Sequence, residues 1–160
     1  MNYKDAENLC NDYIKKYLSN TNYIFRWMSA VKTNGLCNYR DKLICLSSQF
    51  VAINDIEKVR RTIIHEIAHA LCPTHGHDNV WKRKCRELGG DGRRTDRDSV
   101  RPESKYIGTC PNGHIVRYMR KPKHRKSCGI CSNVFDERYL FTVTVNPKYN
   151  SHASHIIFAK

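Results

Sequence analysis

The sequence lacks any long apolar segment, since no run approaches the roughly 18 to 20 residues that a membrane span needs. Its first ten residues, MNYKDAENLC, carry charges from the start and include no apolar stretch of the kind found in signal peptides. These two absences argue against a membrane-embedded or exported protein. They predict a soluble, cytoplasmic chain.

Without an export signal, the eight cysteines are not expected to form disulfides, because disulfides persist mainly in oxidising compartments. Reduced cysteines in a cytosolic protein are usually buried thiols or metal ligands. We predict that three of them bind metal, as argued below. The other five are predicted to be buried or reduced thiols: Cys10, Cys37, Cys45, Cys72 and Cys85.

Acidic residues are also scarce, with 15 Asp and Glu against 28 Lys and Arg and a net charge of +13. The excess is uneven, because the segment from Lys82 to Lys126 contains 15 basic and only 5 acidic residues. Such a charge density favours a polyanionic partner such as nucleic acid. The alternative is a solvated basic face without a specific partner.

The chain length of 160 residues and the 40% hydrophobic content predict one domain with a small appendage. Apolar periodicity predicts a helix at 5–18 and strands near 23–30, 36–39 and 42–46, with a turn at KTNG, 32–35. We expect these strands to form a small antiparallel sheet. The predicted class is α+β, with a first domain at 1–104, a small appended β unit at 105–146 and a tail at 147–160.

Two further helices are expected after the sheet. Asn54 followed by Glu57 fits an N-cap with its reciprocal acid, so one helix is predicted at 55–71 and should end at Cys72-Pro73. The other is predicted at 78–88, capped by Asp78 and ended by two glycines. The rest of the chain predicts a small metal-bound β unit at 110–140 and a last strand at 141–145.

The motif HEIAH lies on the first of these helices. Its two histidines, His65 and His69, are four residues apart, so both imidazoles lie on one helix face and can share a tetrahedral metal ion. Glu66 projects beside such an ion, where a carboxylate can act as general base towards a water molecule. The pattern therefore predicts a catalytic zinc site.

A catalytic zinc needs a third protein ligand, and spacing alone allows His75 or His77. His75 has the spacing of metzincin proteases, but Cys72 stands where those proteases place glycine. His77 directly precedes the helix at 78–88, whose Trp81 and Cys85 can pack against the HEIAH helix.

The segments HEIAHAL, GHDNVW and GGDGRRT resemble the SprT-like family of zinc metalloproteases, which includes a protease of DNA–protein crosslinks. The resemblance covers most of residues 20 to 141 and implies a zincin-like protease domain at 1–104, followed by a zinc ribbon at 105–146. That family follows its HExxH helix with a histidine and an aromatic residue four positions on, which His77 and Trp81 match and His75 and Asn79 do not. The resemblance therefore implies that His65, His69 and His77 bind zinc, that Glu66 is the general base, and that His75 does not coordinate.

A second metal site is predicted from two short knuckles, Cys110-Pro-Asn-Gly-His114 and Cys128-Gly-Ile-Cys131. Gly113 and Gly129 suit tight turns, and a Cys₃His set is typical of structural zinc. The alternative is a reduced thiol cluster without metal. A zinc ribbon also commonly follows the protease domain in the family that the chain resembles. In total we expect two zinc ions per chain.

The segment between the knuckles, IVRYMRKPKHRKS, combines basic residues with a tyrosine on an expected hairpin. Basic side chains suit phosphates, and a tyrosine can stack on a base, so we expect DNA binding without sequence preference. DNA association would place the protein at the nucleoid or nucleus. The predicted contacts are Arg117, Tyr118, Arg120, Lys121, Lys123, Arg125 and Lys126.

These patterns together predict a monomeric zinc endopeptidase that acts on proteins bound or crosslinked to DNA. That the substrates include crosslinked proteins is implied only by the family resemblance. Two alternatives remain open at this point. One is a zinc-stapled nucleic-acid-binding module without proteolytic activity, which would have no use for Glu66. The other is a zinc peptidase that acts on soluble proteins.

Overall fold

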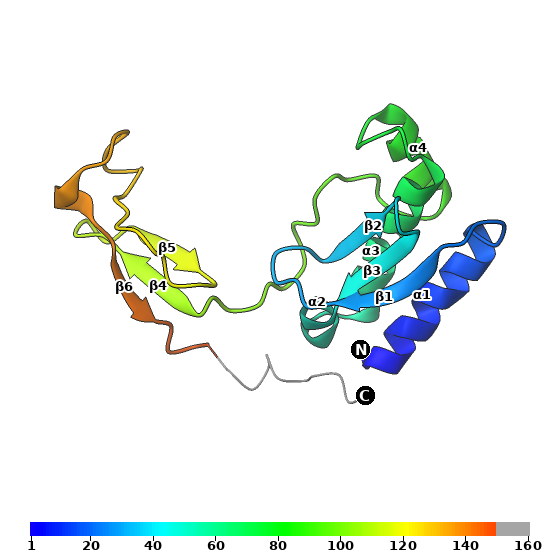
Figure 1. Cartoon of the computed structure of the whole chain (residues 1–160), viewed down its shortest axis with the longest axis horizontal. Coiled ribbons are helices and arrows are strands. Elements are labelled where there is room, and N and C mark those ends of the chain that lie inside the picture. Colours follow the sequence, from blue (N-terminus) through cyan, green and yellow to red (C-terminus); the bar gives the residue numbers. More distant parts are fainter. Residues whose placement is uncertain (150–160) are drawn as a thin grey trace. The chain divides into compact units, whose positions relative to one another are not determined.

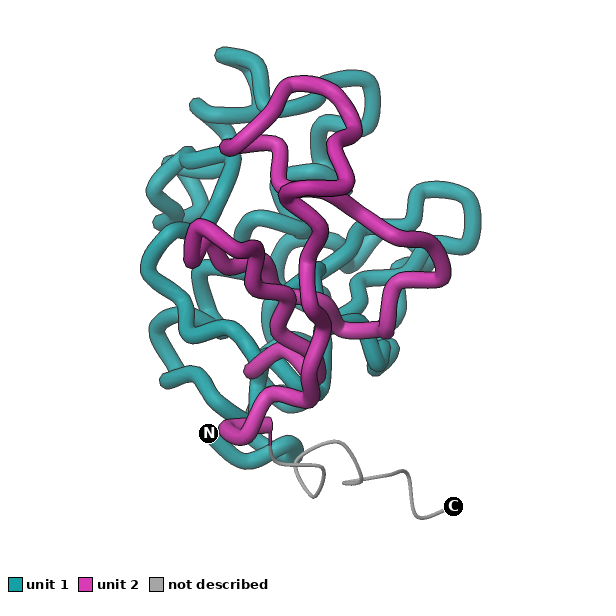
Figure 2. The backbone as a smooth tube through the Cα atoms, turned by 90° about the vertical axis from the view of Figure 1, so that its left-hand side faces the viewer, with its two compact units in different colours: residues 1–102 teal, residues 103–160 magenta. Residues whose placement is uncertain are grey.

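The computed structural model describes residues 1–149 and confirms the α+β class. The chain divides into two compact units, Met1–Pro102 and a second that begins at Glu103 (Figure 2). Figure 1 shows the order of the elements. The first unit holds α1 (Tyr3–Tyr17), β1 (Ile24–Met28), β2 (Gly35–Asn38), β3 (Leu43–Ser47), α2 (Ser48–Ile53), α3 (Ile56–Leu71) and α4 (Asn79–Glu87).

The sheet of the first unit has the order β1-β3-β2, with β3 in the centre. β2 and β3 pair antiparallel across a tight turn, in which Asp41 N–H donates to Asn38 Oδ1 at 3.0 Å. β1, however, pairs with β3 in parallel, with Ile24 opposite Leu43. The prediction of an antiparallel sheet is therefore wrong for β1, because alternation of apolar residues identifies a strand but not its partner.

The main core lies on one face of this sheet. Phe25, Ile44 and Leu46 point to that face and are buried against α1 and α3. From α3, Val59, Ile63 and Ile67 are fully buried in the same cluster. Each such side chain contributes about 1.5–3 kcal/mol through burial, so the core fixes the helix that carries the HEIAH motif.

Two local predictions around α3 are corrected by the structure. The N-cap is Asp55, whose carboxylate accepts from the backbone N–H of Lys58 at 3.0 Å, while Glu57 pairs with Arg60 at 2.8 Å. Asn54 is instead buried after the unpredicted helix α2. Its side-chain amide binds both backbone groups of Val100, at 2.9 and 3.0 Å. The sequence gives no sign of this long-range partner.

The segment after α4 contains no helix or strand before residue 106, as its polar composition predicts. The side chain of Asp78 caps α4 by accepting a hydrogen bond from Trp81 N–H at 3.0 Å. Gly89 follows the C-cap of the helix and has φ +87°. Because Asn54 holds Val100, the loop at 89–101 is tied at its far end to the region before α3.

The second unit holds β4 (Tyr106–Thr109), β5 (Ile115–Tyr118), the short 3₁₀ helix η1 (Glu137–Tyr139) and β6 (Thr142–Val145), the last strand as predicted. Its antiparallel sheet has the order β5-β4-β6. The expected hairpin within 115–127 is not formed, because β5 pairs with β4 across the first knuckle. Of the predicted tail at 147–160, residues 150–160 lie outside the described part. No helix among residues 1–149 is long and apolar enough to cross a membrane.

Candidate metal centres

The first centre is built where α3 ends and α4 begins. α3 carries His65 and His69 on one face and ends at Cys72, whose N–H donates to the carbonyls of Ala68 and His69. The chain then turns back and reaches His77 just before the Asp78 cap of α4. The helix α3 therefore supplies two of the imidazoles, and the turn before α4 supplies the third.

The three imidazoles meet through their Nε2 atoms. The Nε2–Nε2 distances are 3.2 Å between His65 and His69, 3.1 Å between His69 and His77, and 3.1 Å between His77 and His65. A tetrahedral zinc ion with Zn–N bonds of about 2.0–2.1 Å separates its nitrogen ligands by about 3.3–3.4 Å. The triangle therefore fits one tetrahedral cation, and three ligands leave a fourth position free.

The electrostatics of the cluster also favour a cation. Burial, reinforced by its histidine neighbours, lowers the pKa of His65 to about 4, and burial with His77 does the same for His69. Both rings are therefore neutral near pH 7 and can present nitrogen lone pairs. The ring of His65 also forms a hydrogen bond with the backbone of Arg93, which by itself would raise the pKa of the imidazole. This contact orients the ring, and no pattern in the sequence predicts it.

Trp81 packs against all three histidines. Its ring is fully buried, and its centroid lies 4.7 Å from that of His65, 5.0 Å from His69 and 4.6 Å from His77. Its Nε1 has no hydrogen-bond partner among the described residues, so packing holds the indole in place. This single aromatic residue fixes the orientation of the imidazole triangle.

His75 lies outside this cluster. Its Nδ1 pairs with the carboxylate of Asp78 at 2.7 Å, and its side chain is 38% exposed. The structure thus brings His77, and not His75, to the two histidines of α3. Which histidine coordinates metal remains a prediction, and it is tested below.

Glu66 lies beside the histidines and is buried, with 7% of its surface exposed. Burial raises the pKa of its carboxyl to about 8, and a hydrogen bond with the backbone of Cys37 acts in the opposite direction. A carboxyl with a pKa near neutrality can both accept and return a proton. This is the property that acid–base catalysis requires.

Gly35, at the start of β2, lets the edge strand pass directly over Glu66. A Cβ at this position would lie 2.7 Å from Thr62 Cγ2 and 2.9 Å from Glu66 Oε1, closer than real Cβ contacts allow. The sequence suggested only a turn ending at Gly35. No local signal identified this contact, because it joins a strand to a helix about thirty residues later in the chain.

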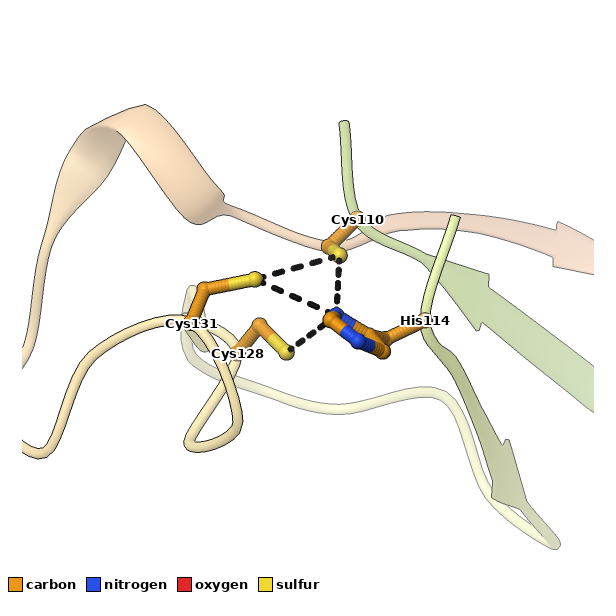
Figure 3. Close-up of side chains that lie close together, drawn as sticks. All are labelled: Cys110, His114, Cys128 and Cys131. Atoms are coloured by element: carbon orange, nitrogen blue, oxygen red, sulfur yellow. Dashed lines mark hydrogen bonds between the residues drawn. The ribbon is translucent and has the colours of Figure 1, made fainter. Parts of the chain in front are cut away.

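The second centre gathers the four side chains of the predicted ribbon site (Figure 3). Cys110 Sγ lies 3.8 Å from Cys131 Sγ and 3.6 Å from His114 Nδ1, and Cys128 Sγ lies 3.6 Å from His114 Nδ1. A tetrahedral zinc ion separates two sulfur ligands by about 3.8 Å and sulfur from nitrogen by about 3.6 Å. Of these distances and the 3.2 Å between His114 Nδ1 and Cys131 Sγ, only the last is shorter than this geometry requires.

The thiol chemistry of this centre also suits a cation. Desolvation, with a hydrogen bond that Cys131 donates to Cys128 as the next cause, raises the pKa of Cys131 to about 11. Because metal ligation requires thiolates, a bound cation would offset the cost of ionising thiols packed this closely. Asn112 Nδ2 additionally donates to Cys131 Sγ at 3.4 Å and orients that sulfur.

Only one of the two knuckle glycines has a backbone conformation that requires glycine. Gly113 has φ +79° and donates its N–H to the carbonyl of Cys110 at 2.9 Å. Gly129 has no positive φ, and a Cβ there would meet nothing within 4 Å. Both knuckles thus form tight turns, the second closed by Cys131 N–H donating to the carbonyl of Cys128 at 3.2 Å, but only the first turn requires glycine.

Five of the seven predicted DNA contacts line one pocket of the second unit, with a volume of about 290 Å³. Tyr118, His124 and Phe141 line it with aromatic surface, and of these only Phe141 lies outside the segment between the knuckles that the sequence singled out. Arg117 and Arg120 do not line it, and Arg125 also pairs with Glu137 at 2.9 Å. The basic lining residues are Lys121, Lys123, Arg125 and Lys126.

Comparison with known proteins gives one result. Residues 4–101 match the sequence model of the SprT-like family, which covers the whole first centre. No curated protein and no solved structure matches the chain. The second centre lies beyond the matched residues, so its interpretation rests on its own geometry.

Proposed function

The chain belongs to the SprT-like family, and we propose that it is a zinc-dependent endopeptidase that acts on proteins bound or crosslinked to DNA. The observation that carries the proposal is the meeting of three imidazole Nε2 atoms within 3.2 Å of one another beside a buried carboxyl. A purely structural metal site would have no use for that carboxyl.

His65, His69 and His77 would hold the catalytic zinc. When bound, the ion supplies Lewis acidity and lowers the pKa of a coordinated water to about 7. Cys110, His114, Cys128 and Cys131 would hold a structural zinc in the second unit, where a closed ligand set leaves no position for chemistry.

Glu66 would perform the proton transfers. Its carboxylate accepts a proton from the attacking water and later returns it to the amine that leaves the cleaved peptide bond. The burial that raises the pKa of Glu66 to about 8 makes the carboxyl a stronger base than an exposed glutamate. Trp81 and the backbone of Arg93 keep the imidazoles oriented during these transfers.

The substrate would bind as an extended strand along β2. This strand is an edge of its sheet and passes over Glu66 at Gly35. An unpaired edge offers backbone N–H and C=O groups to an added strand, so main-chain hydrogen bonds can hold a peptide without a fixed side-chain sequence. Such binding suits a peptidase with varied protein substrates.

DNA as partner is supported by the net charge of +13 and by the basic and aromatic pocket of the second unit. Basic side chains neutralise phosphates, while aromatic rings can stack on bases. A nucleic-acid-binding unit on the same chain would raise the local concentration of DNA-bound proteins at the peptidase.

The test compares a protein crosslinked to DNA with the same protein free, each incubated with wild type, Glu66→Gln and Glu57→Gln. We expect cleavage by wild type and by Glu57→Gln, whose carboxylate lies exposed on the same helix. Glu66→Gln should retain two zinc ions and lose cleavage. If the free protein is cleaved as fast as the crosslinked one, DNA has no part in substrate choice. If Glu66→Gln still cleaves, Glu66 is not the general base.

A further inference from the structure

A cavity of about 220 Å³ opens beside the first centre, and His65 and Glu66 form part of its wall. Its other walls come from the segment before β2, from α3 and from the loop at 89–101. The cavity is smaller than most sites for drug-sized ligands, so its size suits a side chain. Five of its lining residues are basic: Lys32, Arg61, Arg93, Arg94 and Arg101.

Besides Glu66, the lining has two acidic residues, Asp91 and Asp96, and both accept hydrogen bonds from their own loop. Asp91 Oδ1 accepts from the backbone N–H of Arg93 at 2.8 Å. Asp96 accepts from the backbone and hydroxyl of Ser99. Neither of these two carboxylates is left unpaired in the cavity.

Most of the cations, in contrast, have no anion of their own. Arg93 pairs with Asp98 at 3.6 Å. Within residues 1–149, no carboxylate lies within 4.0 Å of the charged groups of the remaining four: Lys32, Arg61, Arg94 and Arg101. Of these, Arg61 still interacts electrostatically with the carboxylate of Asp96, which leaves Lys32, Arg94 and Arg101 without an acidic partner among these residues. The cavity therefore presents unpaired positive charge directly beside the reacting groups.

The loop that supplies these arginines is held in place. Gly92 has φ +69°, and a Cβ at that position would lie 3.2 Å from the carbonyl oxygen of Lys82, so the loop packs tightly on α4. At its other end Asn54 binds both backbone groups of Val100. A fixed backbone places Arg94 and Arg101 at the cavity, which reduces the ordering cost of binding.

We propose that this cavity is a subsite for an acidic side chain of the peptide substrate, next to the cleaved bond. Cleavage should therefore favour Asp or Glu at that position. Arginine suits this role, because its planar guanidinium matches a carboxylate in a bidentate pair. The proposal rests on the proposed peptidase function, since it places the scissile bond at Glu66.

Nucleic acid is the less favoured occupant. A phosphate backbone that entered this cavity would approach the carboxyl of Glu66 and would stand where the scissile peptide bond must lie. The basic pocket of the second unit offers phosphates and bases a separate site without catalytic groups. The substrate peptide is therefore the occupant to which we commit.

The test uses peptides that are identical except for one residue beside the cleaved bond, which is Glu, Gln or Lys. The cut site is first located by mass spectrometry of digested unfolded protein, with and without DNA. We expect kcat/KM for the Glu peptide to exceed that for the Gln peptide by about tenfold, the effect of a charge-assisted hydrogen bond. The Lys peptide should be cleaved more slowly than the Gln peptide.

The Glu-over-Gln ratio is kcat/KM for the Glu peptide divided by kcat/KM for the Gln peptide. It should fall in the variants Arg94→Gln and Arg101→Gln. The matched control is Arg97→Gln, in which the ratio should not change. Arg97 is exposed on the same loop but does not line the cavity. Zinc content is measured for each variant, because Arg94 also influences the pKa of His77. Arg101 has no such contact with the zinc ligands among the described interactions and gives the cleaner result.

Equal cleavage of all three peptides by wild type would overturn this inference while leaving the peptidase function intact. No cleavage of any peptide or protein would instead remove the function. If the arginine variants lower the affinity for a short oligonucleotide and leave the Glu-over-Gln ratio unchanged, the cavity binds nucleic acid and the inference is wrong.

Discussion

Gly35 and Glu66 lie so close that a single Cβ on the glycine would come within 2.9 Å of Oε1 of the carboxylate. The edge strand and the HEIAH helix therefore approach each other at the carboxyl proposed as general base. Any side chain at position 35 must displace both Thr62 and Glu66, or the strand itself. This contact makes the position of Glu66 depend on a residue outside the HEIAH motif.

Gly35→Ala is therefore expected to reduce kcat/KM by about 10²-fold while zinc stays bound, because misplacement of a catalytic group by about 1 Å has this effect. Overpacking should also lower the free energy of unfolding by about 1–3 kcal/mol. Gly76→Ala is the control, since a Cβ there meets nothing within 4 Å. Equal activity of the two variants would show that Glu66 tolerates the displacement.

His77→Ala and His75→Ala test which histidine coordinates metal. His77→Ala should lower the zinc content from two ions to one per chain and abolish cleavage, because two imidazoles on one helix leave the ion with too few ligands. His75→Ala removes only an exposed pair with Asp78, so zinc content and cleavage should stay close to those of wild type. Zinc measured in the purified variants decides, and the reverse pattern would exchange the two roles.

The sequence identified both clusters because their spacings have a geometric meaning. Histidines four apart on a helix share a face, and paired ligands in short knuckles converge on one ion. The third ligand was not determined by spacing, since His75 and His77 follow the same turn. The aromatic match at Trp81 favoured His77, and the structure places that ring against all three imidazoles.

Contacts between distant segments could not be predicted. Asn54 was interpreted as a helix cap from its neighbours, whereas its amide binds Val100, 46 residues later. The parallel pairing of β1 with β3 also depends on where the chain crosses, which apolar alternation does not encode. Local patterns thus predicted the two clusters of side chains, and long-range packing determined how the loop and the edge strand surround the first of them.

The zinc-free protein should show a stability that depends on pH through Glu66. Its pKa rises from 4.5 to about 8 on folding, so the folded state binds more protons between these values. The free energy of unfolding should therefore fall as pH rises through this window, by at most about 1.4 kcal/mol per pH unit. Glu66→Gln should lack this component.

The buried histidines His65 and His69 change the free energy of unfolding with pH in the opposite direction. Their pKa falls from 6.5 to about 4 on folding, so stability is lost as pH falls through this range. Chelator-treated wild type should therefore be most stable near pH 6.5, as measured by urea denaturation. The decline above that pH should be absent in Glu66→Gln, and an identical decline in both proteins would contradict the assigned pKa of Glu66.

Cys131→Ser separates the two metal centres. Loss of one thiolate should remove the second zinc, so metal analysis should give one ion per chain. Cleavage of a short peptide should persist, because the first centre uses no residue of the second unit. Binding to DNA should weaken as the ribbon loses its metal. Loss of peptide cleavage with the first zinc retained would show that the units depend on each other.

DNA affinity should fall steeply with salt, because each neutralised phosphate releases counterions and contributes about 0.7–0.9 to the slope of log K against log salt. Lys123→Ala, in the basic pocket, should reduce the magnitude of that slope by about this amount. Arg138→Ala is the control, because Arg138 is an exposed ribbon cation that pairs with Asp136 at 2.7 Å and lies outside the pocket. Fluorescence anisotropy with a labelled oligonucleotide at several salt concentrations measures both slopes. Equal slopes for the two variants would move the DNA contacts away from this pocket, and a flat dependence for wild type would favour a peptidase that acts on soluble proteins.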